Sequence, residues 1–269
     1  MRIEFDKMEG AGNDFILVDN RTGTIPDRLK TRLVIDCCRQ KFGIGADGML
    51  FLERDDEFDF AWDFFNSDGS RAEMCGNAAR CVARFANRIG AAGGVMTFRT
   101  LAGSIRAELA PFGAKVGLTD ADLPASEERL DVNGSEVELW AVNSGIPHAV
   151  VLVEDLEAAD VPGQGRAIRR HRRFAPAGTN VNFIARRGTS RLAIRTYERG
   201  VEDETLACGT GCVAASVAAG RFLGFSSPVT LETRGGGELT VHFTLAGDKA
   251  IGVSLEGGAR LVFSGAIEV

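Results

Sequence analysis

Short apolar runs dominate the chain, and several of them alternate between apolar and polar positions, which is typical of half-buried β-strands. In the first half of the chain, the pattern predicts strands over residues 3–5, 15–18, 49–53, 58–65, 95–99, 104–109 and 114–118. In the second half it predicts strands over residues 136–142, 149–153, 181–185, 192–197, 229–232, 238–243, 250–255 and 261–263. Strands therefore make up most of the predicted regular structure.

Three segments instead show helical spacing. Arg28–Arg39 has a helical pattern, and Cys75–Asn87 places apolar residues at i, i+3 and i+4, which predicts an amphipathic helix. Cys208–Ala219 is apolar on almost every side, and a helix of that kind is normally buried. We therefore predict an α+β fold in which the strands of each half of the chain wrap a central helix.

Several segments of the first half reappear in the second half at one constant shift of 133 residues. Thr97–Gly103 aligns with Thr230–Gly236, and Cys75 aligns with Cys208. A repeat of this length indicates two domains from an internal duplication rather than a solenoid. We expect two pseudo-symmetric, strand-rich domains, the first formed by residues 1–114 plus 259–269 and the second by residues 115–258.

The two repeated cysteines carry the clearest chemical signal. Cys75 begins a Cys-Gly-Asn turn and Cys208 a Cys-Gly-Thr turn, and each turn leads into an apolar helix. A thiolate at a helix N-terminus is stabilised by the helix dipole and by free backbone N–H groups. Two such thiols on either side of one carbon can remove a proton from one face and return it to the other. This is the chemistry of a racemase or an epimerase.

Composition and charge argue against several other classes of protein. A hydrophobic fraction of 45%, a charged fraction of 25% and a net charge of −6 indicate a globular protein without a surface for nucleic acid or anionic membranes. The only basic run, Arg169–Arg173, lacks interleaved aromatic residues and predicts a solvated loop or strand edge. Because neither a signal peptide nor an apolar run of ~18 residues is present, we expect a cytoplasmic protein with reduced cysteines.

Longer motifs in both halves of the chain resemble those of the diaminopimelate epimerases. In the first half they are KMEGAGNDF (residues 7–15), FNSDGS (65–70) and CGNAARC (75–81). In the second half they are GIPH (145–148), GTNVNF (178–183), YERG (197–200) and ACGTG (207–211). This resemblance covers nearly the whole chain and implies conversion of LL- to meso-2,6-diaminopimelate by a homodimeric enzyme that uses neither pyridoxal phosphate nor a metal.

The resemblance also implies a role for each residue of the site. Cys75 and Cys208 would be the catalytic acid/base pair, and the sequence leaves open which cysteine is the base for which stereoisomer. Helix N-termini bind anions, so the reacting carboxylate would be bound by the backbone N–H groups of Gly76, Asn77, Gly209 and Thr210. Arg199 would bind the distal carboxylate through its planar guanidinium. The remaining distal contacts would come from Asn13, Asn66, Asn180 and Glu198, with His148 in a supporting role near the thiols.

Plainer interpretations are open for some of these residues. Asparagine is common in turns, so Asn13, Asn66 and Asn180 could be turn residues, and His148 could make a structural hydrogen bond. The cysteines at positions 37, 38, 81 and 212 are expected to pack as small apolar side chains on helix faces. Residues 43–48 match the G-x-G-x-x-G pattern, but a predicted helix precedes them and a strand follows, which is the reverse of a nucleotide-binding fingerprint.

Two alternative functions also follow from the sequence. One is another cofactor-independent racemase, acting on proline, hydroxyproline or histidine, and the other is a noncatalytic binding protein on the same fold. Proline-type enzymes usually have Cys-Gly-His at the first thiol, whereas this chain has Cys-Gly-Asn, which favours diaminopimelate. Gly48 and Ile146 differ from residues found in some family members and bear on the substrate range.

Overall fold

The computed structural model describes residues 1–268, which form two compact units. Unit 1 comprises residues 1–117 and 256–268, and unit 2 comprises residues 118–255. The domain boundaries expected after residues 114 and 258 fall close to these limits, and the assignment of the units as two epimerase domains stays a prediction. In the described part of the chain, no helix is both long enough and apolar enough to cross a membrane.

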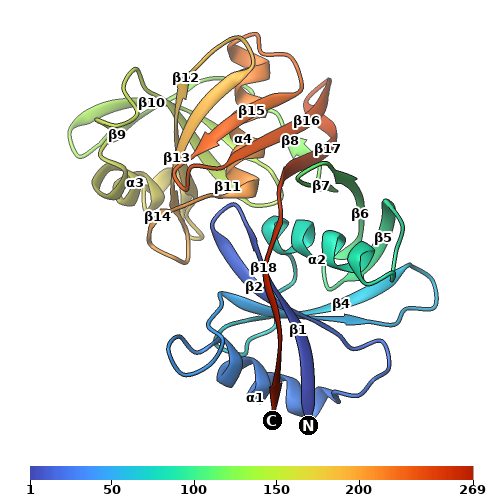
Figure 1. Ribbon diagram of the computed structural model, residues 1–269. Helices are drawn as coiled ribbons and strands as arrows, with labels where there is room; N and C mark the ends of the chain where they lie inside the picture. Colours follow the sequence, from blue (N-terminus) through green and yellow to red (C-terminus); the bar gives the residue numbers. More distant parts are fainter. Residues whose placement is uncertain (269) are drawn as a thin grey trace. The chain divides into compact units, whose positions relative to one another are not determined.

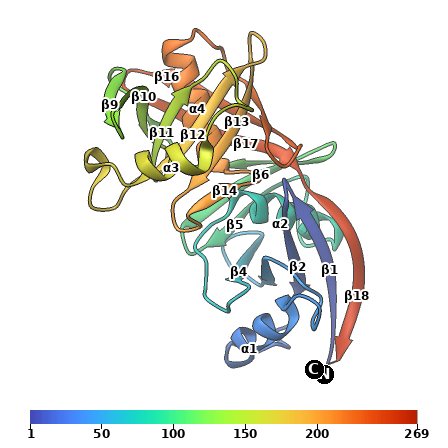
Figure 2. The same cartoon turned by 90° about the vertical axis from the view of Figure 1, so that its left-hand side faces the viewer.

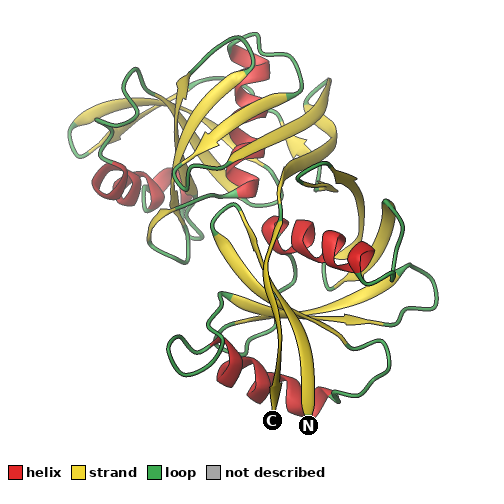
Figure 3. Cartoon of the chain, viewed as in Figure 1, coloured by secondary structure: helices red, strands yellow, loops and turns green. Residues whose placement is uncertain are grey.

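Unit 1 is built from strands that surround one helix (Figures 1 and 3). Its elements are β1 (Arg2–Gly10), β2 (Asn13–Asp19), α1 (Asp27–Cys38), β3 (Gly48–Glu53), β4 (Phe60–Asn66), α2 (Gly76–Arg88), β5 (Val95–Thr100), β6 (Gly103–Ala110), β7 (Gly113–Gly117) and β18 (Arg260–Glu268). Helix α2 contacts β1, β2, β3, β6 and β7, while α1 packs on β3 and β4. Strands β1 and β18 pair along their lengths, as Figure 2 shows.

Unit 2 repeats this arrangement around α4. Its elements are β8 (Ala121–Asp122), β9 (Glu128–Val132), β10 (Ser135–Asn143), β11 (Pro147–Leu152), α3 (Val161–Arg169), the 3-10 helix η1 (Arg172–Phe174), β12 (Asn180–Arg186), β13 (Arg191–Glu198), β14 (Asp203–Thr205), α4 (Gly209–Phe222), β15 (Val229–Thr233), β16 (Glu238–Ala246) and most of β17 (Lys249–Gly258), whose last three residues belong to unit 1. Helix α4 contacts β8, β10, β11, β12 and β16, and every residue from Gly211 to Ala219 is buried. The prediction of a buried central helix is therefore confirmed.

The two units share one strand-pairing scheme. In unit 1, β1–β2 and β3–β4 are antiparallel, and β2–β3 and β4–β5 are parallel. In unit 2, β10–β11 and β12–β13 are antiparallel, and β11–β12 and β13–β15 are parallel. Each parallel pair needs a crossover connection, and helices α1 to α4 lie in these four connections. The predicted α+β fold with an internal duplication is confirmed.

Some elements were not predicted from the sequence. Helix α3 lies where the 133-residue shift places α1, and its N-terminus carries two further signals, since the Asp160 side chain accepts a hydrogen bond from the Gly163 N–H and a proline lies in the first turn. Strands β8 and β14 escaped prediction because they have only two and three residues, and β9 escaped it because three of its five residues are charged.

The expectation for the basic run is wrong. Arg169 ends helix α3, and Arg172 and Arg173 belong to η1, so the run is neither a loop nor a strand edge. Two of its arginines are paired within unit 2, Arg169 with Glu202 at 2.9 Å and Arg173 with Glu128 at 2.7 Å.

Candidate functional site

Each of the central helices begins directly after a cysteine. Cys75 is the N-cap of α2 and Cys208 is the N-cap of α4, and both have extended backbone angles. The first N–H groups of an α-helix have no partner within the helix and carry its positive dipole end. Each thiol therefore stands beside backbone donors that favour a negative charge. Cys75 is half-buried, whereas Cys208 is only 7% exposed.

In unit 1, a chain of amide groups leads from this helix start to a neighbouring loop. The Asn77 side-chain amide donates to Oδ1 of Asn13 at 2.7 Å, and the Asn13 amide donates to Oδ2 of Asp47 at 2.8 Å. The fully buried Arg80 donates to Oδ1 of Asn77 at 2.7 Å. The side chains of Asn13 and Asn77 are thus held by other side chains, which leaves the backbone N–H groups of α2 as the donors for an anion.

The Asn66 side chain belongs to a turn beside this chain of amides. It lies at the end of β4, is exposed, and donates from its amide to Oγ of Ser70 at 3.0 Å. The N–H of the next residue, Ser67, donates to the carbonyl of Asp47 at 3.0 Å, which ties the turn to the loop that holds Asn13. Asn66 therefore fits the turn-residue interpretation, and its side-chain oxygen Oδ1 can still accept a hydrogen bond.

In unit 2, hydrogen bonds run from the start of α4 into the core. The Cys208 Sγ lies 3.6 Å from Oγ1 of Thr210, and this hydroxyl lies 3.1 Å from Nε2 of His148. On its other side, Nδ1 of His148 lies 3.0 Å from Nδ2 of Asn182. Ser144 donates from its hydroxyl to the Thr210 carbonyl at 2.9 Å and holds the first turn of α4 in place.

His148 is neutral in this environment. It is 1% exposed, and burial, with a smaller effect of the Arg199 charge, lowers the pKa of its imidazole to about 3. The sequence left a supporting and a structural role open for this residue. His148 contacts the Thr210 hydroxyl, and this hydroxyl contacts the Cys208 thiol, so one side chain separates the histidine from the thiol.

The distal-site candidates of unit 2 lie where β12 begins and the neighbouring β13 ends. The Asn180 side chain accepts a hydrogen bond from the Arg199 backbone N–H at 2.8 Å and donates to the Pro147 carbonyl at 3.1 Å. Asn180 therefore positions Arg199, whose guanidinium is partly exposed and makes no ion pair or hydrogen bond with another residue of the described chain. Glu198 accepts from the Thr205 hydroxyl at 3.0 Å, and burial raises the pKa of the Glu198 carboxyl.

The predicted residues are divided between the two units. Unit 1 holds Asn13, Asn66, Cys75, Gly76 and Asn77, and unit 2 holds His148, Asn180, Glu198, Arg199, Cys208, Gly209 and Thr210. Sequence reasoning missed Asp47, Arg80 and Asn182, which hold site residues in place. Signals for two of them were available, because Arg80 lies one helical turn after Gly76, and Asn182 shares a strand face with Asn180.

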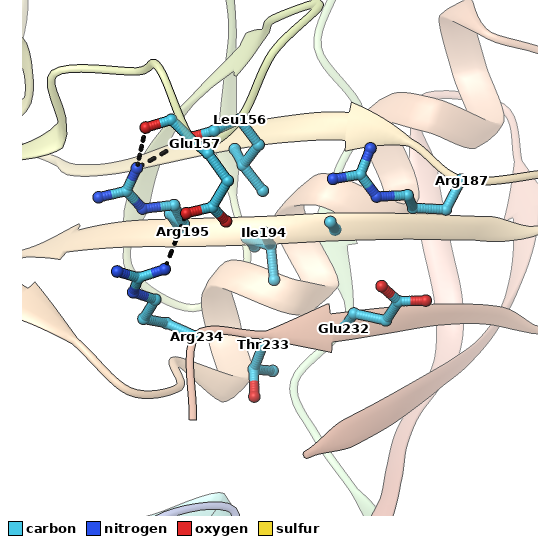
Figure 4. Close-up of a pocket in the computed structure, with 9 residues that line it drawn as sticks. Leu156, Glu157, Arg187, Ile194, Arg195, Glu232, Thr233 and Arg234 are labelled. Atoms are coloured by element: carbon cyan, nitrogen blue, oxygen red, sulfur yellow. Dashed lines mark hydrogen bonds and ion pairs between the residues drawn. The ribbon is translucent and has the colours of Figure 1, made fainter. Parts of the chain in front are cut away.

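A hollow of about 220 Å³ in unit 2 is not this site (Figure 4). It is lined by Leu156, Glu157, Arg187, Ala193, Ile194, Arg195, Glu232, Thr233 and Arg234, and none of the predicted site residues is among them. Two of its arginines are paired with carboxylates, Arg234 with Glu157 at 3.0 Å and Arg195 with Glu204 at 2.7 Å. We therefore centre the candidate site on the two cysteine-capped helices.

Comparison with known proteins decides the family. The sequence model of the family described as diaminopimelate epimerase matches residues 5–123 and 140–262. The chain belongs to the diaminopimelate epimerase family. The diaminopimelate epimerase of Aquifex aeolicus is 44% identical over 274 residues, which cover 98% of this chain and 97% of that protein. The diaminopimelate epimerase of Archaeoglobus fulgidus is 40% identical, with 100% and 98% of the two chains covered.

Solved structures share the fold. A Bacillus anthracis protein of the PhzF phenazine-biosynthesis family superimposes with a TM-score of 0.76 at 13% identity and covers both chains completely. A hydroxyproline epimerase from Agrobacterium vitis superimposes with a TM-score of 0.66 at 16% identity, covering 99% of this chain and 92% of that one. At these identities the likeness shows the fold alone. Membership in the diaminopimelate epimerase family assigns the chain to the isomerases, as an epimerase that acts on a small molecule.

Proposed function

We propose that this chain converts LL-2,6-diaminopimelate to meso-2,6-diaminopimelate, with Cys75 and Cys208 as an acid/base pair and without pyridoxal phosphate or a metal. The observation that carries the proposal is that the duplicated helices α2 and α4 each have a cysteine as N-cap. The full-length likeness to curated diaminopimelate epimerases supports the substrate. The product belongs to the precursors of lysine and peptidoglycan.

The reaction follows from the chemistry of the two helix starts. One cysteine, as thiolate, takes the α-proton, and the other, as thiol, gives its proton to the opposite face of the same carbon. No atom is lost or gained, and the two cysteines end with exchanged protonation. The carbanion has no cofactor to delocalise it, so its charge must move onto the adjacent carboxylate. The backbone N–H groups of Gly76, Asn77, Gly209 and Thr210 are suited to hold that carboxylate and to stabilise the added charge.

The second amino-acid end of the substrate needs a cation for its carboxylate and acceptors for its ammonium. Arg199 has an available guanidinium for the carboxylate, and Asn180 holds its backbone in place. The Glu198 carboxylate and the side-chain oxygen Oδ1 of Asn66 are acceptors for the ammonium. Asn13 contributes by holding Asn77 at the start of α2.

The other described cysteines are unsuited to proton transfer. Cys37, Cys38, Cys81 and Cys212 are 0–5% exposed and lie within helices, as expected of small packing side chains, whereas Cys75 and Cys208 are at helix N-termini. Burial raises the pKa of Cys37 to about 11 and that of Cys38 to about 12, so both are thiols at neutral pH. Because the reaction requires reduced thiols, a reducing compartment such as the cytoplasm is the expected location.

We also propose that the enzyme is a homodimer, and that β18 contributes to its interface. Strand β18 pairs with β1, yet Leu261, Val262 and Phe263 are 37%, 47% and 46% exposed. Consecutive exposed apolar residues on a strand favour pairing with a second copy. Sedimentation equilibrium should give twice the chain mass, and Val262→Lys should shift the enzyme toward monomer; a monomeric wild-type protein would contradict this.

The experiment that tests the function is proton NMR of LL-diaminopimelate in D₂O with the reduced protein. The wild type should remove the α-proton signal and produce the meso form. Cys75→Ala and Cys208→Ala should each reduce the rate by at least about 10²-fold, since general acid–base groups contribute factors of that order. Cys212→Ala, which changes a buried cysteine one turn along α4, should stay active and serves as the matched control.

The alternatives are further outcomes of the same experiment. Exchange with proline or hydroxyproline but not with diaminopimelate would move the substrate while keeping the reaction. An absence of exchange with every amino acid tested would leave a binding protein on this fold.

A further inference from the structure

Asn182, in the core of unit 2, connects indirectly to the Cys208 thiol. Its side chain is fully buried, and its Nδ2 lies 3.4 Å from the Ala149 carbonyl, which can only accept a hydrogen bond. Its Oδ1 accepts a hydrogen bond from the Thr196 hydroxyl at 3.0 Å. The Ala149 carbonyl fixes the orientation of the amide, and the Thr196 hydroxyl is compatible with it, so the NH₂ group faces Nδ1 of His148 at 3.0 Å.

A neutral imidazole has one donor and one acceptor, so its partner at one nitrogen decides the role of the other. His148 is buried, and Nδ1 accepts from Asn182. Its single proton must then lie on Nε2, which donates to the Thr210 hydroxyl oxygen at 3.1 Å.

The Thr210 hydroxyl has one proton of its own to donate. With its oxygen accepting from His148, that proton is free to point at Sγ of Cys208, 3.6 Å away. The Ser144 hydroxyl holds the Thr210 carbonyl and so limits movement of this turn. A donated O–H hydrogen bond stabilises a thiolate more than a thiol, because a charged acceptor makes the stronger bond.

Gly211 provides an independent sign that this arrangement is built into the fold. A Cβ at position 211 would lie 2.3 Å from Oδ1 of Asn182, far inside van der Waals contact. Gly211 lies in the first turn of α4, where an alanine would otherwise favour the helix. The glycine therefore leaves the space that the Asn182 side chain occupies.

We propose that Asn182 is a positioning residue for proton transfer: it fixes the His148 tautomer, so that the Thr210 hydroxyl donates to Sγ of Cys208. This proposal rests on the proposed role of Cys208 as an acid/base residue. Asn182 acts on the thiol through His148 and Thr210, by setting the direction of the hydrogen bonds between them.

The tautomer is tested directly by ¹⁵N NMR of the wild-type protein labelled at histidine. Only three histidines are present, which makes the assignment tractable. His148 should be neutral at pH 7 with its proton on Nε2, and its signals should not titrate between pH 5 and 8. A proton on Nδ1 would overturn the proposal.

The effect on the thiol is tested by the pH dependence of Cys208 alkylation with iodoacetamide, read by peptide mass spectrometry in a Cys75→Ala background. Hydrogen bonds to charged groups are worth about one pKa unit or more, so Thr210→Val and Asn182→Ala should each shift the midpoint upward by about one pH unit. Thr210→Ser keeps the hydroxyl and should restore the wild-type midpoint. Ser216→Ala, at another buried polar position of α4, should leave it unchanged.

An unchanged midpoint in Asn182→Ala would overturn the proposal, and if that variant does not fold, the wild-type tautomer decides. Neither measurement uses a substrate. Failure of the proposed function would appear separately, as an absence of α-proton exchange by the wild-type protein.

Discussion

Replacing Gly211 by alanine should destabilise unit 2, although glycine-to-alanine changes normally stabilise a helix. Alanine in place of glycine gains about 1 kcal/mol in a helix interior. Here the new Cβ would meet Oδ1 of Asn182 at 2.3 Å, so that side chain must leave its place. Its hydrogen bonds with Thr196 and His148 would be lost, and buried polar groups without partners cost about 1–3 kcal/mol each. A loss of about 3 kcal/mol against a gain of about 1 leaves a net destabilisation of about 2 kcal/mol.

The measurement is urea unfolding followed by the fluorescence of Trp140. This indole stacks on Phe222 of α4 with ring centroids 5.4 Å apart, so it reports on unit 2. The protein has two tryptophans, and a Trp62→Phe background leaves Trp140 as the only reporter. Gly220→Ala is the same change further along α4, where the Cβ would lie 3.1 Å from the Phe243 ring and displace no hydrogen-bonded group, so it should alter the free energy of unfolding by less than about 1 kcal/mol.

A double-mutant cycle isolates the cause. In an Asn182→Ala background the obstructing oxygen is absent, so Gly211→Ala should there stabilise unit 2 by about 1 kcal/mol. The sign of the effect should therefore reverse between the two backgrounds. If Gly211→Ala stabilises the protein whether or not Asn182 is present, the packing argument for the glycine is wrong.

Three further predictions concern buried polar groups. His148 has a lowered pKa of about 3 in the folded state against 6.5 ordinarily, so its contribution to stability is full above pH 6.5 and is lost as the pH falls from 6.5 toward 3. Below pH 6.5 the free energy of unfolding of the wild type should thus fall by about 1.4 kcal/mol per pH unit relative to that of His148→Gln. Urea unfolding at pH 7 and pH 5 measures this, and an equal change in the free energy of unfolding for both proteins would contradict it. Lys30 is 4% exposed and contacts Asp27, Glu53 and Asp63 at 2.7–2.9 Å. Lys30→Met should cost about 2 kcal/mol, because Glu53 loses its cation while Arg71 still pairs with Asp27 and Asp63; a loss under 1 kcal/mol in thermal unfolding would argue otherwise. The Ser216 hydroxyl is buried without a hydrogen-bond partner in the described chain. Ser216→Ala should therefore raise the free energy of unfolding by about 1 kcal/mol, and a decrease would contradict the view that this hydroxyl is unsatisfied.

Local sequence patterns were sufficient to predict much of the fold. The apolar helix after Cys208 was predicted as buried, and it is surrounded by strands in unit 2. The constant 133-residue shift correctly predicted the duplication, because related strands kept their spacing. Helix α3 was missed because its short segment contains Pro162, Gly163 and Gly165, which weaken a helical pattern.

The candidate site was less accessible from sequence, because its supporting contacts join residues distant along the chain. The cysteines were found from their Cys-Gly turns, which are local signals. The contact of Asn13 with Asp47 spans 34 positions and that of Asn182 with His148 spans the same number, so neither has a local pattern. The basic run was assigned to a loop or strand edge because the acidic partners of its arginines, Glu202 and Glu128, are also remote in sequence.

The measurement that tests the two-cysteine mechanism most directly is the location of deuterium during the first turnovers in D₂O. LL-diaminopimelate is mixed with the reduced enzyme, the reaction is stopped at low conversion, and both isomers are analysed by mass spectrometry. With two thiols, the base keeps the substrate proton while the other thiol delivers a solvent deuteron. The meso product should therefore carry deuterium while the recovered LL-substrate carries none. Equal deuterium in both isomers from the start would show a single exchanging base and would contradict the mechanism.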